Sequence, residues 1–344
     1  YLLKREEYPA LVNKIKILSN LDIAEKRLPQ DGRINFKHQQ QQFDIRVSIL
    51  PTLHSEKIVL RLLNNDATGI DLNTLGFSEF DLRNYLQGVM RPNGILLISG
   101  PTGSGKTTTL YATLKLLNKE TRNILTIEDP VEYTLEGINQ VQVKESIGFG
   151  FASALRSFLR QDPDVIMVGE IRDAETANIA IRAALTGHLV LSTLHTNDAP
   201  GAVTRLLDLG VAPYLLAASL RGVIAQRLVR RICSNCKTEY EPPASIRRMI
   251  DAQGGDVAKF YRGVGCKKCR NTGFSGRIAI HELFVPDDEI AEMINERINT
   301  KKLRAKALEK GMLPLYHDGI EKVKAGIVSI EEILRTTVND NAGS

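Results

Sequence analysis

The chain has 344 residues, 43% of them hydrophobic and 25% charged, and its 45 Lys and Arg against 40 Asp and Glu give a net charge of +5. These values exclude a disordered or fibrous protein, and so small a charge does not by itself argue for nucleic-acid binding. No apolar run approaches the ~18 residues of a membrane-spanning helix, and no signal-peptide pattern opens the chain. Because the first residue is Tyr1 rather than Met, we expect an excised piece of a longer protein.

Residues 1–70 predict a small α+β domain. A helical pattern comes first, and Phe43–Ile49 then alternates apolar and polar residues as a half-buried strand does. Lys57–Leu63 alternates less regularly. Arg46 and Arg61 are therefore predicted on the polar faces of two strands.

Residues 71–231 alternate apolar strands with helices, which is typical of a parallel α/β sheet. A loop-rich cysteine module follows at 232–276, and short helices are predicted over 277–340. The predicted strands of the sheet are Ile95–Ser99, Asn123–Ile127, Val165–Val168 and His188–Ser192.

A phosphate-binding loop follows the first of these strands. Residues 100–107 fit G-x-x-x-x-G-K-[ST] between a strand and a helix, the context that this motif requires, and this order disfavours a glycine-rich turn that binds nothing. Backbone N–H groups would face a phosphate, Lys106 would reach the β- and γ-phosphates, and the Thr107 hydroxyl would bind Mg²⁺. The predicted nucleotide-binding residues are Gly100, Pro101, Thr102, Gly103, Ser104, Gly105, Lys106, Thr107 and Thr108.

Acidic side chains follow two other strands. Glu170 comes after a strand end at which Gly169 stands in place of the usual Asp, and Glu128 and Asp129 leave the strand that ends at Ile127. One of Glu128 and Glu170 should orient or deprotonate the attacking water while the other helps to hold Mg²⁺. The sequence leaves open which does which, and any single acid here could instead cap a helix or solvate a loop.

One histidine and several arginines complete the candidate site. His195 could sense the γ-phosphate or be a structural histidine, and the sequence favours neither. Arg156 and Arg160 lie four residues apart, predicted on one helix face, and Arg172 closely follows the strand-end carboxylate. Arginine fingers stabilise the transferred phosphoryl group in P-loop enzymes, whereas solvation and salt bridges are the alternative for each arginine.

All four cysteines of the chain lie in two C-x-x-C pairs. They are too few for a disulfide scaffold, so a reducing compartment is expected. Two such pairs predict a structural tetrahedral zinc site, with two redox pairs or an iron–sulfur cluster as the alternatives. The predicted zinc ligands are Cys233, Cys236, Cys266 and Cys269.

These motifs, in this order, resemble those of the ATPases of type II secretion and type IV pilus assembly over residues 10–338. Gly100–Thr109, Ile124–Tyr133, Val165–Asp173 and Thr186–Asp198 match that family's Walker A, Asp box, atypical Walker B and His box. The resemblance implies a RecA-like ATPase domain, a PAS-like N-terminal domain and a zinc insert that pilus retraction ATPases lack. It places six arginines at the family's functional positions, the first two as fingers from the N-terminal domain: Arg46, Arg61, Arg156, Arg160, Arg172 and Arg277.

The resemblance also implies a function. We expect a cytoplasmic homo-hexamer, peripheral at the inner membrane, that hydrolyses MgATP and acts on platform proteins through a further N-terminal domain absent from this chain. Type II secretion is favoured and pilus extension is the close alternative. We expect no nucleic acid as a partner, although a hexameric nucleic-acid translocase and a nucleotide-sensing scaffold are further alternatives.

Overall fold

The computed structural model describes residues 4–38, 41–64, 71–252 and 256–337. The chain forms two compact units, Tyr1–Gly69 with Glu132–Thr134, and Ile70–Val131 with Leu135–Ser344. The domain limits predicted at residues 70 and 340 fall outside the described residues. Within the described part of the chain, no helix is both long and apolar enough to cross a membrane.

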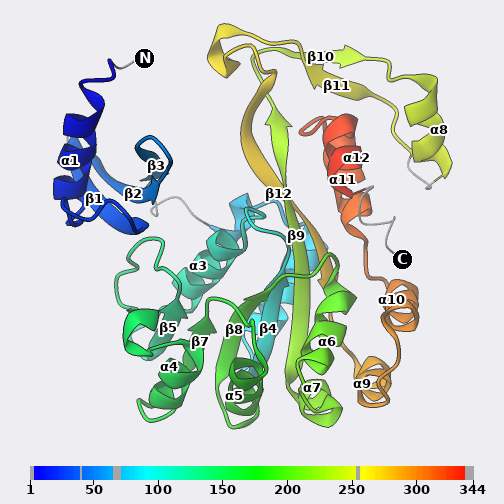
Figure 1. Ribbon diagram of the computed structural model, residues 1–344. Coiled ribbons are helices and arrows are strands. Elements are labelled where there is room, and N and C mark those ends of the chain that lie inside the picture. The colour runs from blue at the N-terminus through cyan, green and yellow to red at the C-terminus, as the bar shows by residue number, and fades with distance from the viewer. Residues whose placement is uncertain (1–3, 39–40, 65–70, 253–255, 338–344) are drawn as a thin grey trace. The chain divides into compact units, whose positions relative to one another are not determined.

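The first unit packs one helix on a three-stranded antiparallel sheet (Figure 1). Its core contains Ile15 from the helix and Ile34, Val47 and Ile49 from the sheet, so the apolar residues of the alternating pattern face the helix. The elements are α1 (Tyr8–Leu18), β1 (Gln30–His38), β2 (Gln41–Pro51) and β3 (Glu56–Asn64).

A seven-stranded sheet forms the centre of the second unit, in the order β12-β9-β4-β8-β7-β5-β6. All neighbours pair in parallel except β12, which is antiparallel to β9, so the predicted α/β fold with a mainly parallel sheet is confirmed. The strands β4, β5, β7 and β8 are buried along their whole length, which explains their unbroken apolar runs. The strands are β4 (Gly94–Ser99), β5 (Ile124–Glu128), β6 (Asn139–Gln142), β7 (Val165–Val168), β8 (Leu189–Leu194), β9 (Leu220–Ile232) and β12 (Phe274–Phe284).

Helices connect these strands and pack on the sheet (Figure 1). Alanines from α5 and leucines from α6 and α7 join the same apolar core as the strands. The helices that precede or connect the strands are α2 (Glu79–Val89), α3 (Lys106–Leu117), α4 (Phe151–Phe158), α5 (Ala174–Leu185), α6 (Ala199–Asp208) and α7 (Pro213–Ser219).

The cysteine module extends from the β9–β12 pair (Figure 1). The limits predicted at 231/232 and 276/277 fall inside β9 and β12, so the segment predicted as helical from residue 277 begins as a strand of the central sheet. The later helices bury Leu303, Val323 and Ile333 in the core of that sheet and share one unit with it. The remaining elements are β10 (Lys237–Tyr240), α8 (Ala244–Ala252), β11 (Phe260–Gly263), α9 (Asp288–Asn295), α10 (Thr300–Glu309), α11 (Leu315–Lys324) and α12 (Ile330–Thr337).

Candidate functional site

Three predicted site segments leave neighbouring parallel strands. The glycine loop follows β4, His195 follows β8 and Glu170 follows β7, and these strands are adjacent in the order β4-β8-β7. Because the carboxyl ends of parallel strands meet at one edge of a sheet, the sheet brings these segments together.

The glycine loop curls between β4 and the start of α3 at Lys106. Gly103 and Gly105 have φ of 80° and 89°, which a residue with a Cβ rarely adopts. The Lys106 ammonium is buried inside the curl and donates to the carbonyl oxygens of Gly100, at 2.7 Å, and Pro101, at 3.1 Å. Burial lowers the pKa of Lys106, and the negative charge of Glu170 partly opposes that shift. The loop therefore presents a fixed cation at the N-terminus of a helix.

Glu170 contacts two of the predicted cationic groups. Its carboxylate pairs with the guanidinium of Arg172, and its other oxygen lies 3.5 Å from Nε2 of His195. The pair with Glu170 raises the pKa of Arg172. We call Lys106, Glu170, Arg172 and His195 the Glu170 cluster, because Glu170 contacts Arg172 and His195 and its charge acts on Lys106.

Glu128 has a different environment. It is buried, and its carboxylate accepts hydrogen bonds from the hydroxyls of Tyr111 and Thr126 and from Nε2 of Gln140, the last two at 2.6 and 3.2 Å. Both oxygens of Glu128 therefore accept hydrogen bonds from side chains inside the protein. The oxygens of Glu170 instead contact the side chains of Arg172 and His195, which are at least half exposed.

The polar pair Gln226–Arg227 in the middle of β9 was not predicted from the sequence. Both side chains are buried, and Arg227 donates to the carbonyl oxygen of Asn197 at 2.7 Å, in the loop after His195. Its positive charge also contributes to lowering the pKa of Lys106. Two polar residues inside an apolar strand run were the signal that could have identified this pair.

The loop after His195 is also fixed by other elements. Ser99 at the end of β4 accepts from the Thr196 N–H at 3.1 Å. Glu282 of β12 accepts from the Ala199 N–H at 2.9 Å and pairs with Arg304 of α10. The site edge is thereby linked to the C-terminal helices.

Arg46 and Arg61 lie in register on one face of the N-terminal sheet, opposite each other in β2 and β3. Arg33 of β1, which the sequence analysis missed, lies opposite Arg46 on the other side. Arg46 also pairs with Glu132, with 2.6 Å between Nη2 and Oε2. Like charges directly opposite each other in a sheet lower its stability. We therefore expect Arg33, Arg46 and Arg61, which we call the arginine row, to serve a function rather than to stabilise the fold.

The other arginines are spread over the second unit. Arg156 pairs with Glu175, and both side chains are more than half exposed. The predicted common helix face of Arg156 and Arg160 is wrong, because α4 ends at Phe158 and Arg160 folds back to donate to the Arg156 carbonyl oxygen at 2.8 Å. Arg277 lies opposite Arg230, where β9 and β12 lead to the cysteine module.

The four cysteine sulfurs converge. Their ligand atoms all lie within 4.8 Å of one another, with sulfur pairs at 3.7, 3.8 and 3.9 Å. A tetrahedral zinc site with Zn–S bonds of ~2.3 Å requires sulfurs about 3.8 Å apart. Three sulfur pairs have this spacing, and the tetrad therefore fits such an ion.

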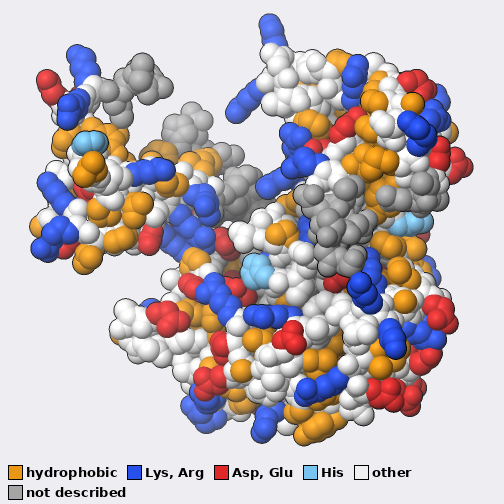
Figure 2. Space-filling model, turned by 45° about the vertical axis from the view of Figure 1, so that its right-hand side comes forward, with side chains coloured by type: hydrophobic (Ala, Val, Ile, Leu, Met, Phe, Trp, Pro, Cys, Tyr) orange, Lys and Arg blue, Asp and Glu red, His pale blue; other side chains and the backbone are white. Residues whose placement is uncertain are grey.

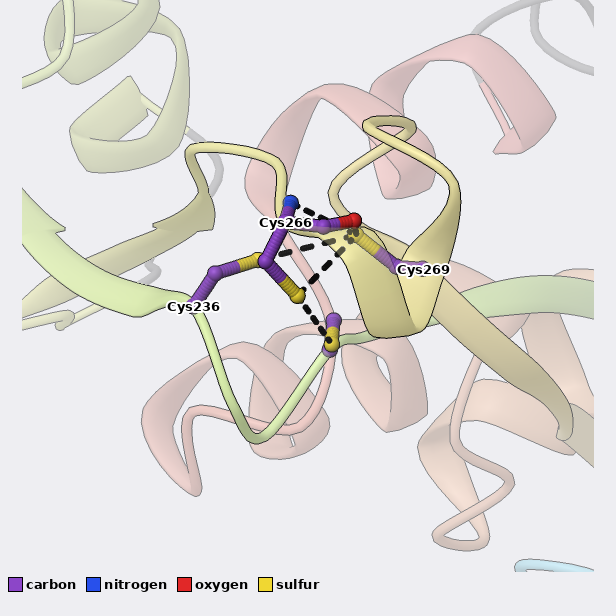
Figure 3. Close-up of side chains that lie close together, drawn as sticks. Cys236, Cys266 and Cys269 are labelled. Atoms are coloured by element: carbon purple, nitrogen blue, oxygen red, sulfur yellow. Dashed lines mark hydrogen bonds between the residues drawn. The ribbon is translucent and has the colours of Figure 1, made fainter.

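Backbone N–H groups favour the thiolate form of Cys269 in this tetrad. Figure 3 shows Cys236, Cys266 and Cys269 turned toward one another from two segments of the chain. The sulfur of Cys269 accepts from the N–H groups of Cys266 and Gly273 at 3.2 and 3.3 Å. Burial opposes ionisation of this thiol, but the two N–H groups together with the sulfurs of Cys266 and Cys236 lower its pKa to about 6, whereas burial raises the pKa of Cys236 to about 12. Such contacts are typical of groups that support metal ligands.

Comparison with known proteins gives a consistent result. A family described as "Type II/IV secretion system protein" matches residues 3–335. The type II secretion system ATPase E of Vibrio cholerae is 49% identical over 327 residues, which cover 95% of this chain and 65% of that protein. The type IV pilus assembly ATPase PilB of Thermus thermophilus is 49% identical over 334 residues, which cover 96% of this chain and 37% of that protein. The chain thus spans less than two thirds of either relative.

Solved structures agree on the fold. The pilus retraction motor PilT with bound ADP is 27% identical, with a TM-score of 0.67 over 97% of this chain and 81% of that one. The ATPase DotB of Legionella pneumophila is 23% identical, with a TM-score of 0.71 over 100% of this chain and 85% of that one, and supports the fold alone.

Proposed function

The chain belongs to the type II/IV secretion system protein family, and we propose that it hydrolyses MgATP to power protein export by type II secretion. The observation that carries the proposal is the Glu170 cluster around the glycine loop, since it joins a phosphate cradle to a carboxylate at one sheet edge. Bound Mg²⁺ would neutralise phosphate charge, and the Thr107 hydroxyl at the start of α3 would hold it.

We assign Glu170 the role of orienting and deprotonating the attacking water. Its carboxylate contacts His195 and Arg172 and acts on the charge of Lys106, so it is close to the groups that would hold the phosphates. Glu128 would position the site through its hydrogen bonds to Tyr111 and Thr126, or help to hold Mg²⁺. His195 would contact the γ-phosphate while it pairs with Glu170.

Further parts of the proposal rest on the family. We assign a RecA-like fold to the second unit, a PAS-like fold to the first, and a structural zinc ion to the cysteine tetrad. We propose a homo-hexamer at the cytoplasmic face of the inner membrane, in which Arg46 and Arg61 act as fingers and Arg156, Arg160, Arg172 and Arg277 are further arginines of the catalytic site.

Type II secretion is preferred over pilus extension because type II secretion proteins are prominent among the close relatives, at 49% and 53% identity. A pilus assembly relative at 49% identity keeps the second function as the alternative. Figure 2 shows Lys and Arg side chains together with Asp and Glu on the visible face. The net charge of +5 is too small to argue for a nucleic-acid translocase, which stays the less favoured alternative.

The direct test is phosphate release from MgATP by the purified chain and its Lys106→Ala variant. We expect hydrolysis in the wild type and its loss in the variant, because Lys106 is the fixed cation of the loop. Lys115→Ala, exposed on the same helix, is the matched control and should retain activity. A folded Lys106→Ala protein with wild-type turnover would refute the assigned site.

A further inference from the structure

Gln226 is a buried amide in the middle of β9, with 2% of its surface exposed. Its Nε2 donates to the carbonyl oxygen of Ser104 at 2.9 Å, and its Oε1 accepts from the hydroxyl of Thr109 at 2.8 Å. A carbonyl can only accept, so the NH₂ side of the amide must face Ser104. One side chain from a distant strand thus holds both the end of the glycine loop and the start of α3.

The contact with Ser104 fixes the direction of a peptide group in the loop. In a trans peptide, the Ser104 carbonyl and the Gly105 N–H belong to one plane and point to opposite sides. With the carbonyl held against Gln226, the Gly105 N–H is directed away from β9. Because β9 fills that side of the loop, a phosphate must approach from the other side, where this N–H points.

The two outer glycines of the loop pack directly on the same residue. A Cβ added to Gly100 would lie 2.5 Å from the Gln226 carbonyl oxygen, and one added to Gly105 would lie 2.8 Å from its Nε2. The first contact is with backbone and leaves no room for a Cβ, and the second would push the Gln226 amide away from its hydrogen-bond partners. These glycines are therefore required by the close approach of Gln226 as well as by backbone conformation.

We propose that Gln226 is a positioning residue of the nucleotide site, which holds the glycine loop in its phosphate-binding form from outside the loop motif. The inference rests on the proposed nucleotide binding and names a determinant of affinity that the motif does not contain. An apolar residue at 226 would leave the Ser104 carbonyl and the Thr109 hydroxyl buried without this partner, and the Ser104–Gly105 peptide free to rotate.

Three variants test the two hydrogen bonds. Gln226→Leu removes both, Gln226→Glu keeps the acceptor for Thr109 but loses the donor to Ser104, and Thr109→Val removes the contact from the helix side. We expect the Kd for a fluorescent ATP analogue and the KM for ATP to rise about tenfold in both Gln226 variants, with kcat within about threefold of wild type. Thr109→Val should shift both constants in the same direction.

Arg231→Gln, exposed on the same strand, is the control and should leave Kd and KM unchanged. If folded Gln226→Glu protein binds the analogue as wild type does, the inference is overturned, even where Gln226→Leu is too unstable to assay. A lower melting temperature with unchanged Kd would mean that Gln226 only supports the fold. That result would also overturn the inference. Wild-type protein that binds no nucleotide would instead refute the proposed function.

Discussion

Glu170 lies among positive groups, and its substitution separates catalysis from binding. Glu170→Gln keeps the size of the side chain but removes the carboxylate that contacts His195 and Arg172. We expect kcat to fall by about 10² or more, because general-base catalysis contributes that much, while the Kd for ATP stays within about threefold. Single-turnover hydrolysis and analogue binding measure the two quantities.

Glu136→Gln, exposed on the second unit, is the control for this substitution and should have wild-type kinetics. Loss of ATP binding together with turnover would assign Glu170 a mainly metal-binding or structural role. If Glu128→Gln alone stopped turnover in a folded protein, the base would be Glu128.

His281 gives the second prediction at the scale of single residues. It is fully buried and stacks on Phe77 with 3.8 Å between ring centroids, and burial, aided by the charge of Lys322, lowers its pKa to about 3. In the unfolded chain the pKa of histidine is ~6.5. Between these values the unfolded state binds more protons, so the free energy of unfolding falls as pH falls, by up to ~1.4 kcal/mol per pH unit.

His281→Phe retains an aromatic ring for the stack and removes this titration. We expect the wild type to lose more thermal stability than the variant between about pH 7 and about pH 5, and measurements of Tm at both pH values test this. Equal losses in the two proteins would show that His281 does not contribute to the acid sensitivity.

The sequence motif identified Gly169, Glu170 and the glycine loop, because these residues are adjacent in the chain to strands that can be recognised. It could not identify Gln226 or Arg227, since their contacts with residues 104, 109 and 197 are made across the sheet. The structure also explains Gly169. A Cβ there would lie 3.2 Å from the Ile127 carbonyl oxygen of β5, so an Asp would crowd the neighbouring strand.

At the scale of elements, the cysteine module contains the short antiparallel pair β10–β11, the helix α8 and the thiol tetrad. We expect ~1 zinc per chain by elemental analysis, and loss of the metal in Cys233→Ser, because thiolate sites contribute folding energy to small loop-rich segments. Hydrogen exchange should rise within residues 231–276 while ATP affinity is retained. Ser234→Ala, exposed between the two ligands, should keep its zinc.

Zinc-free wild-type protein with an ordered module and four titratable thiols would contradict this prediction. Iron together with acid-labile sulfide would instead indicate an iron–sulfur cluster, which the sulfur spacing of 3.7–3.9 Å does not favour over a single ion.

The strands were predictable as elements because full burial makes their sequences continuously apolar. The ends of the helices were harder to predict. The segment after Leu155 continues a helical pattern through Arg160, but α4 ends at Phe158 and Asp162 has φ of 49° before a proline. The strand β12, which pairs antiparallel with β9, was not predicted. The second cysteine pair suggested a domain limit at 276/277, and this limit lies inside the strand.

At the scale of the whole molecule, the sequence predicted a domain boundary after the N-terminal sheet. It did not predict that the C-terminal helices share one hydrophobic core with the central sheet. The C-terminal helices each look amphipathic alone, and only the fold shows that Leu303, Val323 and Ile333 face the central sheet. The arginine row of β1–β3 was equally inaccessible, because register places Arg33 beside Arg46.

The arginine row leads to a prediction about assembly. If Arg61 reaches the nucleotide of a neighbouring subunit, Arg61→Ala should lower turnover at least ~100-fold, given the contribution of arginine fingers. An arginine that only solvates a sheet face would cost less than ~0.5 kcal/mol and leave turnover unchanged. Turnover per chain should also rise with protein concentration, because a finger supplied in trans requires association.

A mixture of inactive chains distinguishes fingers in trans from fingers in cis. Arg61→Ala chains have an intact glycine loop and Lys106→Ala chains have an intact arginine row, so an active site can form where the two meet in the right order. In random rings of an equal mixture about one quarter of the interfaces are of this kind, and we expect up to about a quarter of wild-type turnover. Fingers in cis would give no rescue, because each chain carries one defect of the pair. Mixing Lys106→Ala with Arg231→Ala chains tests whether an inactive chain silences the ring that contains it: half of those chains keep both groups, so about half of wild-type turnover is expected.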